Sequence, residues 1–197
     1  MLKVYGDYRS GNGYKVRLLL QVLGREHRWI AGDGLGGEPH RTNDLAGAEE
    51  PVVELECGSC LRGANAILNR LAAGSALLPR VPYLRTQVLQ WQFFEQYSHE
   101  PNVALARFIQ LYQGLPEARR EEYAACKARG YKALKVMEQQ LRRTPYLVGD
   151  DYSIADIALY AYTHVAHQGG FDLGAYPAIC AWLQRVARHP RHIDMHD

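Results

Sequence analysis

The 197-residue chain has no apolar run that approaches the ~20 residues of a membrane-spanning helix. It also lacks an excess of one charge, since 23 Lys and Arg residues face 21 Asp and Glu residues. This balance excludes a strongly basic nucleic-acid binder and an acidic tail. The first residues lack the long apolar stretch and the cleavage site of a signal peptide. We therefore expect a cytoplasmic protein with no nucleic-acid or membrane partner.

Cysteine is scarce, and its pattern excludes a disulfide framework in an intracellular chain of this size. The four cysteines are Cys57, Cys60, Cys126 and Cys180. Cys57 and Cys60 form a C-x-x-C sequence, but it lies between two strand-like runs and therefore predicts a hairpin turn. No second Cys or His pair completes a zinc site, and His164 and His167 have no third ligand in view. We expect no metal, and a redox role for the C-x-x-C pair stays open.

The pattern of the chain changes near residue 80. Alternating, β-prone segments predict strands, and apolar residues at helical spacing predict the helices between and after them. The expected strands are 2–6, 28–31, 51–56 and 60–62, and the expected helices are 14–23, 65–73, 83–113, 117–143 and 177–188. Pro101 should kink the long helix 83–113. The fold class is thus an α/β domain (residues 1–74), a linker (75–82) and an all-α domain (83–197).

Two local signals lie near the C-terminus. Ser153 and Asp156 have the spacing of a capping box at the start of a helix, with Asp in place of the usual Glu. Beyond the last helix, His189, His192 and His196 lie in a tail that we expect to be mobile.

Four segments together resemble those of bacterial glutathione S-transferases, over nearly the whole chain. They are the opening strand followed by residues 8–16 (YRSGNGYKV), Pro51 before a hairpin followed by 65–68 (NAIL), the long helix with 93–96 (FFEQ), and residues 148–157 (VGDDYSIADI). The resemblance implies a thioredoxin-like N-terminal domain, an all-helical C-terminal domain, a homodimer and a cis peptide bond before Pro51.

The resemblance also implies a glutathione site in the N-terminal domain. A side chain at the start of the first helix would hold the sulfur as a thiolate, and here the candidates are Ser10 and Asn12, with Tyr8 and Arg9 beside them. The alternative role of Ser10 and Asn12 is capping of that helix. The backbone of Glu50, before Pro51, would pair with the cysteinyl unit.

Several anchors that the resemblance implies are replaced. Glu49 stands where the family has a cation, and Glu50 stands where it has a β-branched residue. Gly63 and Ala64 occupy the position of the Glu/Gln-Ser pair that holds the γ-glutamyl end. Each charge-assisted hydrogen bond lost contributes about 1.5–3 kcal/mol. Together the changes weaken glutathione binding by roughly 10³-fold or more, at 1.4 kcal/mol per decade.

A second candidate site lies on the long helix, against the cleft that this fold forms between its domains. At helical spacing, one face carries aromatic, small and charged residues. They are Tyr97, Pro101, Ala104, Arg107, Phe108, Leu111 and Tyr112, with Glu100 adjacent. Such a wall suits a small aromatic or hydrophobic molecule, with Arg107 and Glu100 as catalytic candidates. The alternatives are core or dimer packing and an Arg107–Glu100 ion pair.

Three functions remain open at this point. The first is an enzyme that uses no glutathione and acts on a small hydrophobic or aromatic molecule by isomerisation, elimination, cyclisation or addition. The second is a glutathione-dependent transferase with a rebuilt site at Ser10 or Asn12. The third is a non-catalytic binder of small molecules. The sequence favours the first, without a cofactor.

Overall fold

The computed structural model describes residues 1–31 and 51–195. The chain forms two compact units, of which the first comprises Met1–Ser75 with Pro190–Asp197 and the second Ala76–His189. The residues from Pro190 therefore group with the N-terminal unit and not with the helices that precede them. The described residues include no helix long and apolar enough to cross a membrane.

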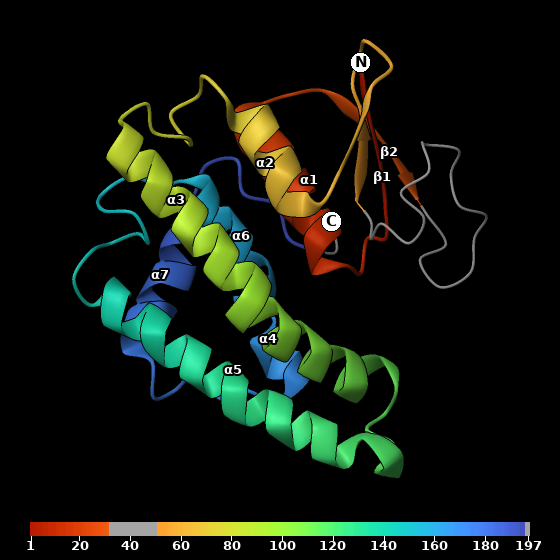
Figure 1. Cartoon of the computed structure of the whole chain (residues 1–197), viewed down its shortest axis with the longest axis vertical. Helices are drawn as coiled ribbons and strands as arrows, with labels where there is room; N and C mark the ends of the chain where they lie inside the picture. Colours follow the sequence, from red (N-terminus) through yellow and green to blue (C-terminus); the bar gives the residue numbers. More distant parts are fainter. Residues whose placement is uncertain (32–50, 196–197) are drawn as a thin grey trace. The chain divides into compact units, whose positions relative to one another are not determined.

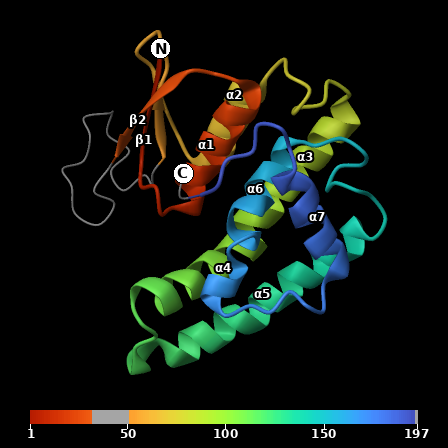
Figure 2. The same cartoon turned by 180° about the vertical axis from the view of Figure 1, so that it is seen from behind.

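The first unit is built on a four-stranded mixed sheet with the order β2-β1-β3-β4. Its elements are β1 (Leu2–Gly6), α1 (Gly11–Leu23), β2 (His27–Ala31), β3 (Val52–Glu54), β4 (Cys60–Arg62) and α2 (Ala64–Ala72). β2 runs parallel to β1, whereas β3 is antiparallel to both β1 and β4. Figures 1 and 2 show α1 and α2 side by side next to the sheet. This is the thioredoxin-like arrangement that the resemblance to glutathione S-transferases implied.

The register of the sheet orients the unit. Tyr5 pairs with Val52 near the end of β1 that leads to α1, and Lys3 pairs with Glu54 near the other end. Val4 and Val53, which face each other between these pairs, are fully buried under the helices. The start of α1 and the start of β3 thus lie at one end of the sheet, and the β3–β4 turn lies at the opposite end.

The second unit is entirely helical. It comprises α3 (Pro82–Phe94), α4 (Glu100–Arg107), α5 (Arg120–Leu141), α6 (Ile154–Thr163) and α7 (Pro177–Ala187), with 3₁₀ turns at Glu117–Arg119 and Ala166–Gly169. All ten residues of α6 are buried, and α3, α4 and α7 all contact it. The complete burial of α6 and its contacts with these three helices place it at the centre of the unit, which can be followed in Figure 2.

The helix that we expected over 83–113 is interrupted twice by π-helix, at Glu95–His99 and at Phe108–Tyr112. The first interruption directly precedes Pro101, which has no N–H and whose ring crowds the carbonyl of residue 97. A π-helical turn accommodates this because it shifts the hydrogen bonds from i+4 to i+5. Where the sequence predicted a kink at Pro101, the structure shows a local change in helical winding.

The capping box at the start of α6 is confirmed. Ser153 Oγ accepts a hydrogen bond from the Ala155 N–H, and Asp156 Oδ2 accepts one from the Ser153 N–H at 2.9 Å. Asp156 Oδ1 also accepts from the Leu147 N–H and from Trp182 Nε1, both at 2.9 Å. Burial raises the pKa of Asp156 to about 6, although these hydrogen bonds favour the ionised carboxylate.

The C-terminal residues up to 195 are held in place, so the expectation of a mobile tail is wrong for them. Tyr14 of α1 donates its hydroxyl to the Ile193 carbonyl at 2.8 Å, with His192 Nε2 at 3.3 Å. Arg17 donates to the Met195 carbonyl at 3.0 Å. His196 lies outside the described residues.

Candidate functional site

The N-terminus of α1 carries the first two candidate residues. Ser10 is the N-cap of this helix, and its backbone carbonyl accepts from the Tyr14 N–H at 2.9 Å. Its side chain makes no capping hydrogen bond, so the hydroxyl is not engaged in the capping role that the sequence allowed. A Cβ at position 13 would lie 2.8 Å from the Asp7 carbonyl, so only glycine lets the helix start this close to the preceding loop.

Asn12 lies one helical turn before Lys15, whose burial the sequence did not predict. Lys15 is fully buried, and its ammonium donates to Asn12 Oδ1 at 2.7 Å. A buried cation near the positive end of a helix dipole makes this helix start favourable for negative charge. The three-residue spacing between Asn12 and Lys15 was the available signal, but a lysine in an amphipathic helix is normally exposed.

The neighbouring candidates Tyr8 and Arg9 have different surroundings. Arg9 forms a bidentate ion pair with Asp7, with Nη2 2.8 Å from Oδ2 and Nε 3.0 Å from Oδ1. The Tyr8 ring packs against Trp29 in a tilted arrangement with ring centres 4.9 Å apart, and the guanidinium of the buried Arg17 lies 4.5 Å from the centre of the Tyr8 ring. Tyr8 is therefore part of an aromatic and cationic wall, whereas Arg9 is held by Asp7.

The N-terminus of α2 carries no polar side chain at its first two positions. Gly63 is the N-cap, with φ 78° and ψ 116°, and Ala64 is the first helical residue and is buried. A Cβ added at Gly63 would meet nothing within 4 Å, so the space beside this helix start is open. Pro51, directly before β3, is buried. Glu49 and Glu50 lie outside the described residues.

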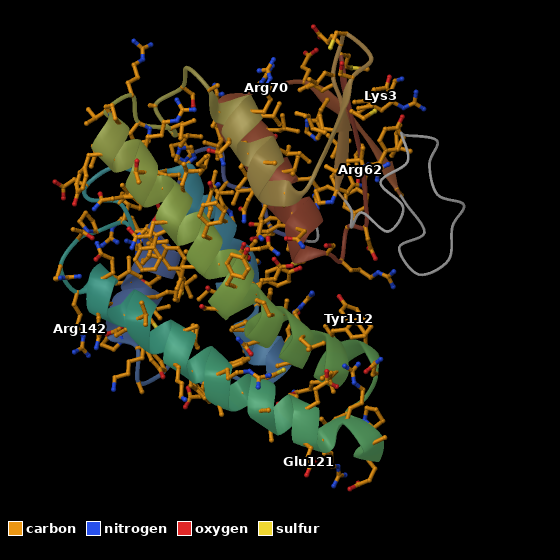
Figure 3. All side chains as sticks on the ribbon, in the orientation of Figure 1. Lys3, Arg62, Arg70, Tyr112, Glu121 and Arg142 are labelled. Atoms are coloured by element: carbon orange, nitrogen blue, oxygen red, sulfur yellow. The ribbon has the colours of Figure 1, made fainter. Side chains whose placement is uncertain are left out.

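The candidates on the long helix separate into two groups. Arg107 is only 3% exposed, its Nε donates to Gln168 Oε1 at 2.6 Å, and its guanidinium lies 5.3 Å from the centre of the Tyr112 ring. Phe108 packs beside Tyr112, which is labelled in Figure 3, with ring centres 6.0 Å apart. Tyr97, by contrast, is 78% exposed. The half-buried Glu100 follows it, at the start of α4.

The histidines of the helical unit do not form a metal site. His164 stacks on Tyr160 with ring centres 4.7 Å apart, and its Nδ1 lies 2.9 Å from the Tyr160 carbonyl oxygen. His167 is exposed. Within residues 1–31 and 51–195, no group of three or more His, Cys, Asp or Glu side chains could hold a metal ion.

A thioredoxin-like sheet unit followed by an all-helical unit, with polar residues at the start of α1, defines the glutathione S-transferase fold. Residues 89–190 match the family model "Glutathione S-transferase, C-terminal domain". The crystal structure of a glutathione S-transferase from Pseudomonas fluorescens Pf-5 is 65% identical, covers 100% of this chain and 99% of its own, and has a TM-score of 0.95. The chain therefore belongs to the glutathione S-transferase family.

Curated relatives with other names are more distant. The chain is 29% identical to the disulfide-bond oxidoreductase YfcG of Escherichia coli K12, over 91% of this chain and 87% of that protein. It is 26% identical to a maleylacetoacetate isomerase of Rhizobium meliloti strain 1021, over 93% of this chain and 90% of that protein. Proteins similar to this chain thus bear the names of a transferase, an oxidoreductase and an isomerase.

Proposed function

We propose that the protein is an enzyme on the glutathione S-transferase fold whose glutathione site is largely lost. It acts on a small hydrophobic or aromatic molecule by isomerisation, elimination, cyclisation or addition, and it uses no glutathione. The observation that carries the proposal is the start of α2, where Gly63 and Ala64 offer no polar side chain. The name of the isomerase relative supports a reaction of this kind on a related chain.

The chemistry of glutathione explains why the start of α2 matters. Its γ-glutamyl end carries a carboxylate and an ammonium, which need a donor and an acceptor in the protein. Gly63 has no side chain and Ala64 has only a methyl group, so both contacts are missing. Each charge-assisted hydrogen bond contributes about 1.5–3 kcal/mol, so the loss of two is large compared with the total binding energy of a small ligand.

The start of α1 retains the means to stabilise negative charge. The Lys15 ammonium lies against Asn12, and Ser10 supplies a hydroxyl at the N-cap. In the proposed reaction these groups stabilise a carboxylate, an enolate or a phenolate of the substrate by hydrogen bonding and by charge. Tyr8, packed against Trp29, supplies an apolar surface beside them.

The helical unit supplies the second set of proposed residues. Phe108 and Tyr112 form an aromatic pair against Arg107, and Tyr97 and Glu100 precede them along the chain. Because Arg107 is almost completely buried, it acts on a ligand by placing the Tyr112 ring and by its charge, and its guanidinium does not project into solvent.

A second candidate function is a glutathione-dependent transferase that uses Ser10 or Asn12. The Lys15–Asn12 contact favours it, because a buried ammonium would also stabilise a thiolate at the start of α1. In this case the carboxylate and ammonium of glutathione must be held by residues other than Gly63 and Ala64. The third alternative is a non-catalytic binder of small molecules. It differs from the glutathione-independent enzyme only in that the bound molecule is not converted.

We also propose a cytoplasmic homodimer. Three large apolar residues on α3 and the segment after it, Leu89, Phe93 and Tyr97, follow one another at intervals of four and are all exposed. Such a stripe on a helix face is typical of a contact with another chain. The face that we assign to the dimer is therefore the Leu89–Phe93–Tyr97 stripe.

The proposal is tested by two measurements on the native protein. Retention on a glutathione column and calorimetric titration decide whether glutathione binds, and mass spectrometry under native conditions identifies small molecules that copurify. We expect no retention on glutathione and a bound aromatic or hydrophobic compound that the protein converts. Tight, saturable glutathione binding contradicts the first function and supports the second, whereas a bound compound that is never converted supports the third.

A further inference from the structure

The two cysteines of the C-x-x-C sequence lie on the β3–β4 hairpin, as the sequence predicted, and the proposed function does not use them. The turn is closed by hydrogen bonds from the Gly58 N–H to the Leu55 carbonyl and from the Leu55 N–H to the Ser59 carbonyl, both at 2.9 Å. Gly58 has φ 82°, a left-handed conformation that reverses the chain between Cys57 and Cys60. Space is open here, since a Cβ at Gly58 would meet nothing within 4 Å.

The hairpin tip is remote from the start of α1 in the same unit. The antiparallel register places the end of β3 opposite the beginning of β1, where Lys3 pairs with Glu54. The N-terminal ammonium lies 2.9 Å from Glu56 at the tip, and Figure 1 shows the N-terminus close to this turn. Chemistry at the tip therefore occurs at the opposite end of the sheet from Ser10 and Asn12.

Cys57 has the exposure and the surroundings of a reactive thiol. Its side chain is solvent-exposed, and Cys60 on β4 is partly exposed. Hydrogen bonds from the side chain and the backbone of Ser59 lower the pKa of the Cys57 thiol. The thiolate is the nucleophile in thiol–disulfide exchange, so both features increase reactivity.

The other two cysteines differ from this pair. Cys126 is completely buried, and its sulfur lies against the Pro101 carbonyl at 4.0 Å. Cys180 is partly exposed, and its thiol donates to the Leu173 carbonyl at 3.4 Å. Each lies on a helix of the second unit without another cysteine nearby in the sequence. Cys180, which is partly exposed like Cys60, therefore serves as an internal control.

We propose that Cys57 and Cys60 form a thiol–disulfide exchange site that reacts with small disulfides. The Cys57 thiolate attacks one sulfur of a disulfide RSSR, forming a Cys57–SR mixed disulfide and releasing RS⁻. Cys60 then loses its proton and attacks the Cys57 sulfur, which forms the Cys57–Cys60 disulfide and releases the second RS⁻. The pair is oxidised by two electrons, and RSSR is reduced to two thiols.

The reverse reaction makes the site catalytic. A thiol in excess attacks the Cys57–Cys60 disulfide and regenerates the dithiol in two exchange steps. Exposed disulfides are the ones that are readily reduced, and a bond at this hairpin tip is reached from solvent without opening the core. The site thus transfers electrons between thiols and disulfides, independently of whether the start of α1 binds glutathione.

The test uses the reduced, full-length protein and bis(2-hydroxyethyl) disulfide, followed by intact-mass and peptide mass spectrometry. For the wild type we expect the loss of two hydrogen atoms, with Cys57 joined to Cys60 and no adduct retained. Cys60→Ser should stop at one mercaptoethanol adduct on Cys57. Cys57→Ser should lose the reaction at the hairpin, and Cys180→Ser should behave as the wild type.

A fourth variant tests the role of Ser59. Ser59→Ala removes the side-chain hydrogen bond to the sulfur, so the pH profile of adduct formation in a Cys60→Ser background should shift to higher pH. The proposal is overturned if the wild type retains an adduct on Cys57 without forming the internal bond. It is also overturned if Cys57→Ser reacts at Cys60 as fast as the wild type reacts, or if the pH profile does not move.

Discussion

Restoring the missing side chains at the start of α2 should restore glutathione binding. The variant combines Gly63→Glu and Ala64→Ser with Glu49→Lys, which replaces an acidic residue at the position where the resemblance implies a cation. The open space beside Gly63 accommodates a side chain. At about 1.5–3 kcal/mol for each charge-assisted hydrogen bond, two restored contacts return about 3–6 kcal/mol. This corresponds to a gain in affinity of roughly 10²–10⁴-fold.

The same variant should be less stable than the wild type. Gly63 has φ 78° and ψ 116°, and a residue with a Cβ in such a conformation costs about 1–3 kcal/mol. This strain is present with and without the ligand, so it lowers the free energy of unfolding and leaves the affinity unchanged. We therefore expect a lower Tm for the free variant and a recovery of Tm when glutathione is added.

Calorimetric titration with glutathione measures the gain. The matched control, Gly63→Ala with Ala64→Ser and Glu49→Lys, has the same backbone strain but lacks the restored carboxylate. It should show the lower Tm and a smaller gain in affinity. A contrary result is that the full variant binds glutathione no better than the wild type while both variants remain folded. In that case other residues fill the pocket, and a few side-chain replacements do not explain the loss of glutathione binding.

Three further predictions concern the dimer, the core and the buried arginine. Phe93→Glu should shift the protein to a monomer in analytical ultracentrifugation, whereas Val136→Glu, at another exposed apolar residue on α5, should not. If both variants remain dimers, the Leu89–Phe93–Tyr97 stripe is not the dimer contact. Because the folded-state pKa of Asp156 is raised from 3.8 to about 6, its contribution to stability is greatest below the unfolded-state pKa and is lost as the pH rises through 6. In the wild type, the free energy of unfolding measured in urea should therefore fall by up to roughly 3 kcal/mol over this pH range. Asp156→Asn should abolish this fall, and an unchanged pH dependence in the variant contradicts the prediction. Arg107→Ala should lower the free energy of unfolding by about 2–4 kcal/mol, since it removes a buried side chain and leaves Gln168 without its donor; an unchanged Tm would contradict this role of Arg107 in packing.

Local signals accounted for much of the fold. Ser153 and Asp156 predicted the start of α6 because a capping box depends only on residues three apart. The hairpin at Cys57–Cys60 was predicted for a similar reason, since two short β-prone runs flank it. The alternation and helical spacing of apolar residues also separated the sheet unit from the helical unit.

Features that depend on distant or unusual contacts were missed. Lys15 is fully buried, and its ammonium donates to Asn12. The helical spacing of apolar residues does not predict the burial of a lysine. The C-terminal residues are held by Tyr14 and Arg17, more than 170 positions earlier in the chain. The π-helical winding of Glu95–His99 changes which side chains share a face, so Tyr97 is exposed whereas Arg107 is buried.

The measurement that tests the central claim most directly is a calorimetric titration of the wild-type protein with glutathione. If Gly63 and Ala64 have removed the anchors of the γ-glutamyl end, millimolar glutathione should give no saturable heat and should raise the Tm by less than ~1 °C. Saturable binding with a micromolar Kd would contradict the account.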